Sequence, residues 1–268
     1  MPFPKVVRVH YKKQPLDNVI CQVRFPTILS IDTKKPSILQ KKLYPQYIFF
    51  KEQNEVIFDV RALGGPESNL EQIKGFSPPE VINYEFASED NRWKVNLTRN
   101  FFSISTTSYS GWEDFKKKFS FVLKAFVEVY KPVLFTRIGL RYTDVIVRSK
   151  LDLAETDWVE LINPIILGVL GSACVKKSIK HYQSVFVIGL KDDPGEVRIA
   201  TGLVKSKLGE DCFLIDSDYY DTKKRKADEL IERLELFHSK AYAQFRWGIQ
   251  EKLHMALEPR IIKSKKLT

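Results

Sequence analysis

The chain has 268 residues, of which 44% are hydrophobic and 28% are charged, a composition that supports a large buried core and excludes an intrinsically disordered protein. Its net charge of +10 points to an anionic partner, yet eight of the ten excess charges lie in the two terminal segments. These are Lys5, Arg8, Lys12, Lys13, Arg260, Lys263, Lys265 and Lys266, which leaves residues 14–259 with a net charge of only +2.

Nothing in the sequence predicts secretion or insertion into a membrane. The first residues lack the apolar stretch of a secretion signal, and the longest apolar run, 164–175, is too short to span a bilayer. Cys21, Cys174 and Cys212 lie far apart and form no CxxC pair. We therefore expect reduced thiols, a cytoplasmic location and no membrane partner.

The first half of the chain predicts an antiparallel sheet. Apolar and polar residues alternate in five runs, at 19–25, 56–62, 81–88, 92–99 and 101–107, and 37–44 has the pattern of a short helix. Short turn segments separate the last three runs, which indicates a meander.

A long amphipathic helix is predicted directly after this meander. Apolar side chains recur at helical spacing over 112–130, and Pro132 ends the pattern. Ser110 and Glu113 have the spacing of a capping box at its start. The phenylalanine-rich stripe predicts a helix face packed on the sheet, and 134–147 predicts the next strand.

The second half repeats this order of elements. Residues 177–190, 196–204 and 212–216 predict three strands. Helical periodicity then continues from 222 almost to 257, which predicts a final helix that is either long or kinked near His238.

The expected fold class is therefore α+β, with two similar halves, each an antiparallel β-meander covered on one face by a long amphipathic helix. We place the first half, with its basic arm, at 1–150. A crossover follows at 151–175, and the second half, with its basic tail, occupies 176–268.

Alternation along 134–147 places Arg137 and Arg141 on the face opposite the apolar side chains. Lys94 and Arg24 join them if their strands belong to the same sheet. Guanidinium groups match phosphate and carboxylate, so this face is a candidate surface for nucleic acid, a nucleotide or an acidic partner. The alternative is a solvated sheet face, or one on which the halves meet through ion pairs.

Four successive cations, Lys223, Lys224, Arg225 and Lys226, open the last predicted helix. Cations at that end oppose the helix dipole, and a bound anion would relieve the conflict. The alternative is a solvated charged loop ahead of the helix.

Signatures of catalysis are few. The four histidines are scattered, and the chain has no Walker A, GxSxG, GxGxxG or HExxH pattern. Asp216, Asp218 and Asp221 follow a predicted strand and precede lysines, an order compatible with a metal-dependent nuclease or phosphoesterase. Turn and capping roles explain the same pattern, so we favour a protein without catalytic activity and expect no cofactor and no metal.

Several segments carry a family resemblance: 15–26 (PLDNVICQVRFP), 93–103, 135–142, Tyr109 with 112–115 and, more weakly, His238 ahead of Phe245. They resemble a functionally unassigned, sporadically distributed family of prokaryotic proteins of about this length. It implies a cytoplasmic protein whose patchy occurrence is similar to that of genes on mobile or defence-related elements. It supplies no catalytic residues.

Together these patterns favour a non-catalytic binding protein that recognises a nucleic acid, a nucleotide or a protein partner, in a mobile-element or defence context. One alternative is the metal-dependent enzyme. Another is an assembly or toxin-neutralising subunit whose aromatic surface or sheet edge docks a partner. Uncovered sheet edges are also compatible with a homodimer.

Overall fold

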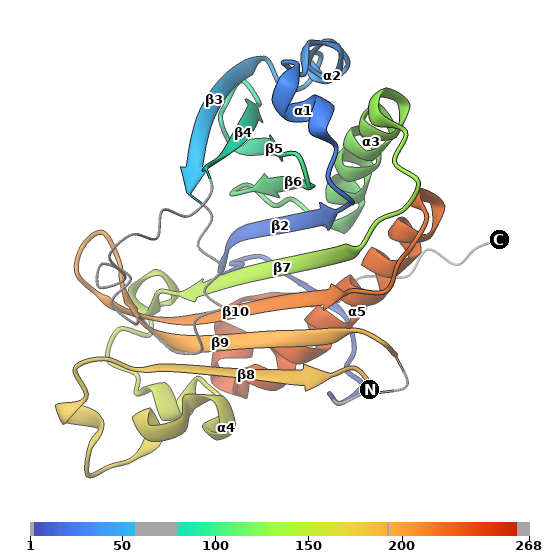
Figure 1. The fold of residues 1–268 in the computed structure, drawn as a ribbon. Coiled ribbons are helices and arrows are strands. Elements are labelled where there is room, and N and C mark those ends of the chain that lie inside the picture. Colours follow the sequence, from blue (N-terminus) through green and yellow to red (C-terminus); the bar gives the residue numbers. More distant parts are fainter. Residues whose placement is uncertain (1–2, 57–79, 192, 262–268) are drawn as a thin grey trace, which may run out of the picture.

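A computed structural model describes residues 3–56, 80–191 and 193–261 of the chain. Within these residues a nine-stranded antiparallel sheet runs through the molecule, in the order β3-β4-β5-β6-β2-β7-β10-β9-β8 (Figure 1). The two longest helices, α3 and α5, lie on one face of this sheet. The prediction of an α+β protein with a large antiparallel sheet is therefore confirmed.

The helices and strands between the two terminal segments follow one another along the chain in two sets. The first set is β2 (Leu16–Arg24), α1 (Leu29–Thr33), α2 (Ser37–Leu43), β3 (Phe49–Val56), β4 (Glu80–Ala87), β5 (Trp93–Leu97), β6 (Phe101–Thr106) and α3 (Trp112–Tyr130). The second set is β7 (Arg137–Ile146), α4 (Pro164–Leu167), β8 (Gln183–Gly189), β9 (Glu196–Lys205), β10 (Asp211–Asp221), α5 (Leu230–Gly248) and α6 (Glu251–Ala256). The predicted strand at 56–62 lies outside the described residues, apart from Val56.

The centre of the sheet is the antiparallel pair β2 and β7. Their alternating apolar side chains, such as Val19, Cys21 and Leu140, are fully buried on the side that carries the helices. The phenylalanines of α3, including Phe119 and Phe126, pack onto this layer as the helical spacing predicts. Burial of this apolar layer is the main contribution to stability.

The start of α3 differs from the prediction. The helix begins at Trp112, so Gly111 occupies the capping position and provides no side-chain cap. The Ser110 hydroxyl lies one residue too early and donates instead to Asp114 Oδ2 at 2.9 Å. The predicted capping box is therefore wrong.

The last helix also differs from the prediction. Helix α5 continues through His238 and ends at Gly248, so the alternative of a kink near His238 is wrong, and the long helix stops before the expected end near 257. The chain breaks at Ile249, which pairs with Ile162, and Gln250 N–H donates to the Leu161 carbonyl at 2.8 Å before α6 begins. Contacts with a distant segment, which local periodicity does not contain, set this boundary.

The two ends of the described chain meet in a small second sheet. Strand β1 (Val9–Tyr11) pairs antiparallel with β11 (Pro259–Ile261). The Tyr242 hydroxyl of α5 accepts from Val9 N–H at 3.0 Å and donates to the Val7 carbonyl at 3.1 Å. The N-terminal arm (residues 3–15) is therefore fixed across α5.

Among the described residues, no helix is long and apolar enough to cross a membrane.

Candidate functional site

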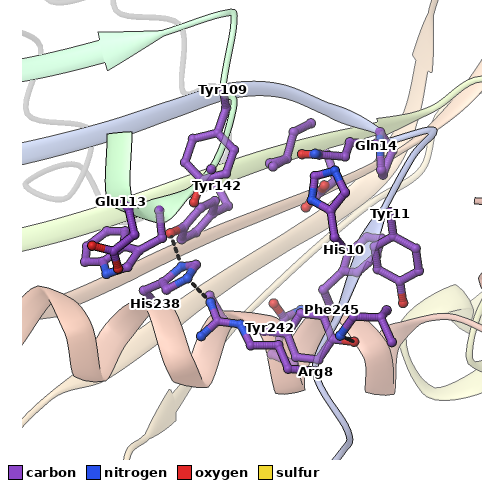
Figure 2. A pocket seen from close by; sticks show the side chains of 18 residues that line it. Arg8, His10, Tyr11, Gln14, Tyr109, Glu113, Tyr142, His238, Tyr242 and Phe245 are labelled. Atoms are coloured by element: carbon purple, nitrogen blue, oxygen red, sulfur yellow. Dashed lines mark hydrogen bonds between the residues drawn. The ribbon is translucent and has the colours of Figure 1, made fainter. Parts of the chain in front are cut away.

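A pocket of about 410 Å³ lies between the N-terminal arm, the start of α3, the middle of α5 and strand β7 (Figure 2). The lining residues are Arg8, Val9, His10, Tyr11, Gln14, Pro15, Leu16, Tyr109, Gly111, Trp112, Glu113, Tyr142, Asp144, His238, Ala241, Tyr242, Gln244 and Phe245. Eight of the eighteen carry an aromatic or imidazole ring, so the walls are suited to a flat or apolar ligand.

The rings of the pocket contact one another in defined orientations. The His238 imidazole stacks on the Trp112 indole, with centroids 4.4 Å apart and planes 11° apart. Tyr109 meets Tyr142 edge-on at 6.2 Å, and Tyr11 meets Phe245 edge-on at 5.8 Å. These contacts hold the walls in place before any ligand binds.

A chain of hydrogen bonds runs along one wall of the pocket, from Arg8 to His238 to Tyr142 (Figure 2). Arginine only donates, so His238 Nε2 accepts from the Arg8 guanidinium. Burial, with the charges of Arg8 and Lys116, lowers the pKa of His238 to about 3. The neutral imidazole then carries its proton on Nδ1 and donates it to the Tyr142 oxygen at 2.8 Å, which leaves the Tyr142 hydroxyl proton available for another acceptor.

Three polar groups of the pocket are buried and incompletely paired, namely the Asp144 carboxyl, the Gln244 amide and the Tyr109 hydroxyl, which has no hydrogen-bond partner among the described residues. Asp144 is 6% exposed, and no hydrogen bond to its carboxyl group from a described residue contributes to its pKa. Burial, followed by the charge of Asp216, raises the pKa of Asp144 to about 8. Gln244 is 1% exposed; its Oε1 accepts from Ser217 Oγ at 2.9 Å, but its Nε2 has no partner among the described residues. Buried polar groups of this kind are rare in native proteins and point to a missing partner.

The predicted cationic face is formed, but its arginines are bound to carboxylates. Arg137 Nη2 lies 2.9 Å from Asp218 Oδ2, and Arg141 binds both oxygens of Asp216, at 2.6 and 2.8 Å. These pairs join neighbouring strands β7 and β10 on the face opposite the helices.

The other two predicted members of this face are also engaged. Lys94 Nζ donates to both Glu85 oxygens, at 3.0 and 3.1 Å, and Arg24 Nε donates to Gln22 Oε1 at 3.2 Å. Lys94, Arg24, Arg137 and Arg141 therefore share one sheet face, on which local partners hold them.

The three acids of the alternative enzyme site do not converge. Asp216 and Asp218 lie inside β10 on the arginine-bearing face, whereas Asp221 faces the helices and is 1% exposed. Asp221 Oδ2 binds Arg225 Nη2 at 2.5 Å and lies 3.0 Å from Arg233 Nε. In the parts of the chain that the structure describes, no group of three or more His, Cys, Asp or Glu residues could hold a metal ion.

The four predicted anion-binding cations lie in the segment before the last helix and do not form its first turn. A 3-10 turn (Ala227–Glu229) with Lys226 at its N-cap leads directly into α5, and Arg225 pairs with Phe135 in a bridge. Lys223 N–H donates to Asp221 Oδ1 at 2.7 Å, and Lys226 N–H donates to Glu229 Oε2 at 2.7 Å. Lys224 lines a shallow depression with Arg24.

The most distinctive residues of the pocket were not predicted, although the sequence contains a signal for them. Tyr142 and Asp144 continue the core-facing register of Ile138 and Leu140, so a carboxyl group falls on an apolar face. Gln244 falls in the apolar stripe of α5 in the same way. A polar side chain in a core register indicates a candidate site.

Comparison of the chain with protein-family models, with curated proteins and with solved structures finds no match in any of the three.

Proposed function

We propose that the protein is a non-catalytic binding protein that holds a small ligand in the pocket between α3, α5 and β7. The observation that carries this proposal concerns two buried groups of a preformed aromatic pocket: the Asp144 carboxyl has no hydrogen bond from a described residue that affects its pKa, and the Gln244 Nε2 has no partner among the described residues. A ligand that supplied both partners would remove an energetic penalty that the folded chain otherwise bears.

A nucleotide is the ligand class that suits the pocket best. The aromatic walls suit the faces of a base, and stacking of this kind contributes about 1–3 kcal/mol per base. Arg8 is exposed and is the only lysine or arginine among the lining residues, which suits a phosphate outside the base.

The side chains that line the pocket favour ligand binding over catalysis. Among the described residues, the lining includes no serine, threonine, cysteine or lysine that could act as a nucleophile. Both ring nitrogens of His238 are engaged, by Arg8 and by Tyr142, so the imidazole is not free to act as a base.

The resemblance to the prokaryotic family supports the same location. The segments that carry it contribute Pro15, Leu16, Tyr109, Trp112, Glu113, Tyr142, His238 and Phe245 to the lining. We propose on this ground that the pocket is the shared functional site of such proteins, in a cytoplasmic mobile-element or defence context.

We also propose that the fold arose by duplication of one unit. Each unit would contain a first strand, a connection, an antiparallel meander whose last strand pairs with the first strand, and a covering helix. The first unit is β2, β4–β6 and α3, and the second is β7–β10 and α5. The two first strands pair at the centre of the sheet, which places the pocket where the units meet.

A thermal-shift screen with nucleotides, amines and short nucleic acids tests the binding proposal. We expect a small ligand to raise the melting temperature, and Gln14→Trp, which fills the pocket from the arm, to abolish the shift. Gln53→Trp on β3 is the matched control, because Gln53 is similarly half-buried and lies outside the lining. No shift from any small ligand would contradict the proposal.

The nucleic-acid alternative places the ligand on the open sheet face. A phosphate there would have to displace Asp216 or Asp218 from the arginines. Tight low-salt binding of nucleic acid that is abolished in Arg141→Gln would favour that face over the pocket.

A further inference from the structure

The charged groups around Asp144 leave its carboxyl group without a counter-ion from the described residues. The titratable and charged groups that surround it come from four elements. They are Arg8 and His10 of the arm, Glu113 of α3, His238 of α5 and, on the opposite face of the sheet, Asp216 of β10. The Arg8 guanidinium is bound to His238 Nε2 and lies 5.8 Å from the Tyr242 ring centre. Glu113 pairs with Lys116 at 3.0 Å.

Asp144 therefore lacks hydrogen-bond donors, whereas Gln244 lacks an acceptor. N–H donors from a ligand favour the ionised form of Asp144, and this carboxylate can accept two parallel N–H bonds. The Gln244 Nε2 group can donate to a carbonyl oxygen. A ligand that completes both must present adjacent N–H donors and a carbonyl oxygen. The aromatic walls require that these groups lie on a flat ring.

Guanine meets these requirements. Its N1–H and N2–H₂ groups are adjacent donors, and its O6 is a carbonyl acceptor on the same edge. Adenine presents an acceptor at N1, which would face the carboxylate and be repelled by it. A simple organic amine would satisfy Asp144 but would leave the Gln244 Nε2 donor without a partner.

We propose that the pocket recognises a guanine nucleotide, with the Asp144 carboxylate binding the N1–H and N2–H₂ edge of the base and the Gln244 amide binding O6. The inference rests on the proposed function, since it names the ligand of the same pocket. The phosphate lies toward Arg8, an exposed cation of the arm that lines the pocket.

Calorimetric titration with four nucleoside monophosphates tests this specificity. Guanosine monophosphate is expected to bind best, inosine monophosphate about tenfold more weakly because it lacks N2–H₂, and adenosine monophosphate about 100-fold more weakly. Xanthosine monophosphate, which has an oxygen at position 2, is expected to bind weakly to the natural chain.

Asp144→Asn provides the decisive variant, because an amide offers one donor and one acceptor in the same shape. It is expected to weaken guanosine monophosphate roughly 10- to 100-fold and to strengthen xanthosine monophosphate. The strengthened xanthosine binding shows that the variant is folded. Asp17→Asn, at an exposed position beside Leu16, is the control and is expected to change neither affinity.

Each remaining outcome contradicts the inference in a different way. Equal affinity for guanosine and adenosine monophosphates would remove base recognition by Asp144. Binding of amines alone would leave a ligand pocket but overturn the guanine assignment. Binding of none of these compounds or of any other small ligand in the screen would overturn both the inference and the proposed function.

Discussion

Asp144 occupies a position that the alternation of β7 assigns to the core, between Tyr142 and Ile146. A carboxyl group at such a position opposes folding whenever it is ionised, because nothing in the described structure compensates its charge. Functional sites commonly retain groups of this kind at the expense of stability.

This penalty predicts a pH-dependent gain in stability for Asp144→Asn. The pKa of Asp144 is raised from 3.8 to about 8 in the folded chain. Relative to high pH, protonation of this carboxyl group therefore stabilises the folded chain fully below pH 4, and this stabilisation is lost as the pH rises to 8. The amide does not titrate. The variant should therefore gain on the natural chain by up to about 1.4 kcal/mol per pH unit across this window.

Urea denaturation of both proteins at pH 5 and pH 8 measures the effect. A difference in unfolding free energy that is the same at both pH values would show that the Asp144 carboxyl is not desolvated in the folded chain.

Asp221 has a structural role that differs from the catalytic one that the acid cluster suggested. Its carboxylate is buried between Arg225 and Arg233, so Asp221→Asn would remove the buried charge that these two arginines share and leave them only Glu229 and Asp193. The unfolding free energy should fall by about 3 kcal/mol. Asp218→Asn, at a more exposed pair, should lower it by about 1 kcal/mol or less. Equal effects in the two variants would contradict this role.

At the scale of elements, the N-terminal arm forms one wall of the pocket, and Tyr242 holds it there. Tyr242→Phe removes two hydrogen bonds, with Val7 and Val9, and should speed amide exchange over residues 7–11. Ligand affinity should fall by roughly 5- to 10-fold, since a hydrogen bond contributes about 1 kcal/mol.

Tyr182→Phe is the matched control for this prediction. It removes a single hydrogen bond, to the Ile166 carbonyl, at a site outside the pocket. It should leave both exchange in the arm and ligand affinity unchanged. An arm that exchanges at the same rate in Tyr242→Phe and in the natural chain would contradict the assigned role of Tyr242.

Most elements could be predicted from the sequence because their patterns are local. Alternation identified β2, β4, β5, β6 and β9 to within a few residues, and helical spacing identified α3. The break after α5 depends on pairing with Ile162, and β1 and β11 each contain only three residues from opposite ends of the chain. Neither feature can be predicted from a short stretch of sequence, because each depends on pairing between distant segments.

The candidate site was harder to predict than the fold. Tyr109, Trp112 and His238 stood out in the sequence, yet only the folded chain brings them to one place beside Asp144. The cations that looked most functional, such as Arg137 and Arg225, are bound by aspartates from β10. Net charge and spacing show which groups are present, but not which of them remain unpaired.

At the scale of the whole molecule, the excess positive charge belongs to the ends of the chain. Any binding to nucleic acid should therefore depend on the tails rather than on the sheet. Replacement of Lys5, Lys263, Lys265 and Lys266 by glutamine should weaken low-salt binding and reduce the salt slope by roughly one for each phosphate that is no longer neutralised.

Arg141→Gln should leave this weak binding unchanged, because Asp216 already neutralises the guanidinium. Fluorescence anisotropy with a short labelled duplex measures the affinity of both variants. The salt concentration is varied from about 50 to about 200 mM, the range over which phosphate contacts weaken. A larger decrease in affinity for Arg141→Gln than for the tail variant would place nucleic acid on the sheet face.

The most direct measurement is a crystal structure of the protein with guanosine monophosphate. We expect the base between the aromatic walls, with N1 and N2 within hydrogen-bond distance of the Asp144 carboxylate and O6 facing Gln244. A base bound on the open sheet face beside Arg141, with the pocket unchanged, would contradict the assignment of the pocket as the functional site.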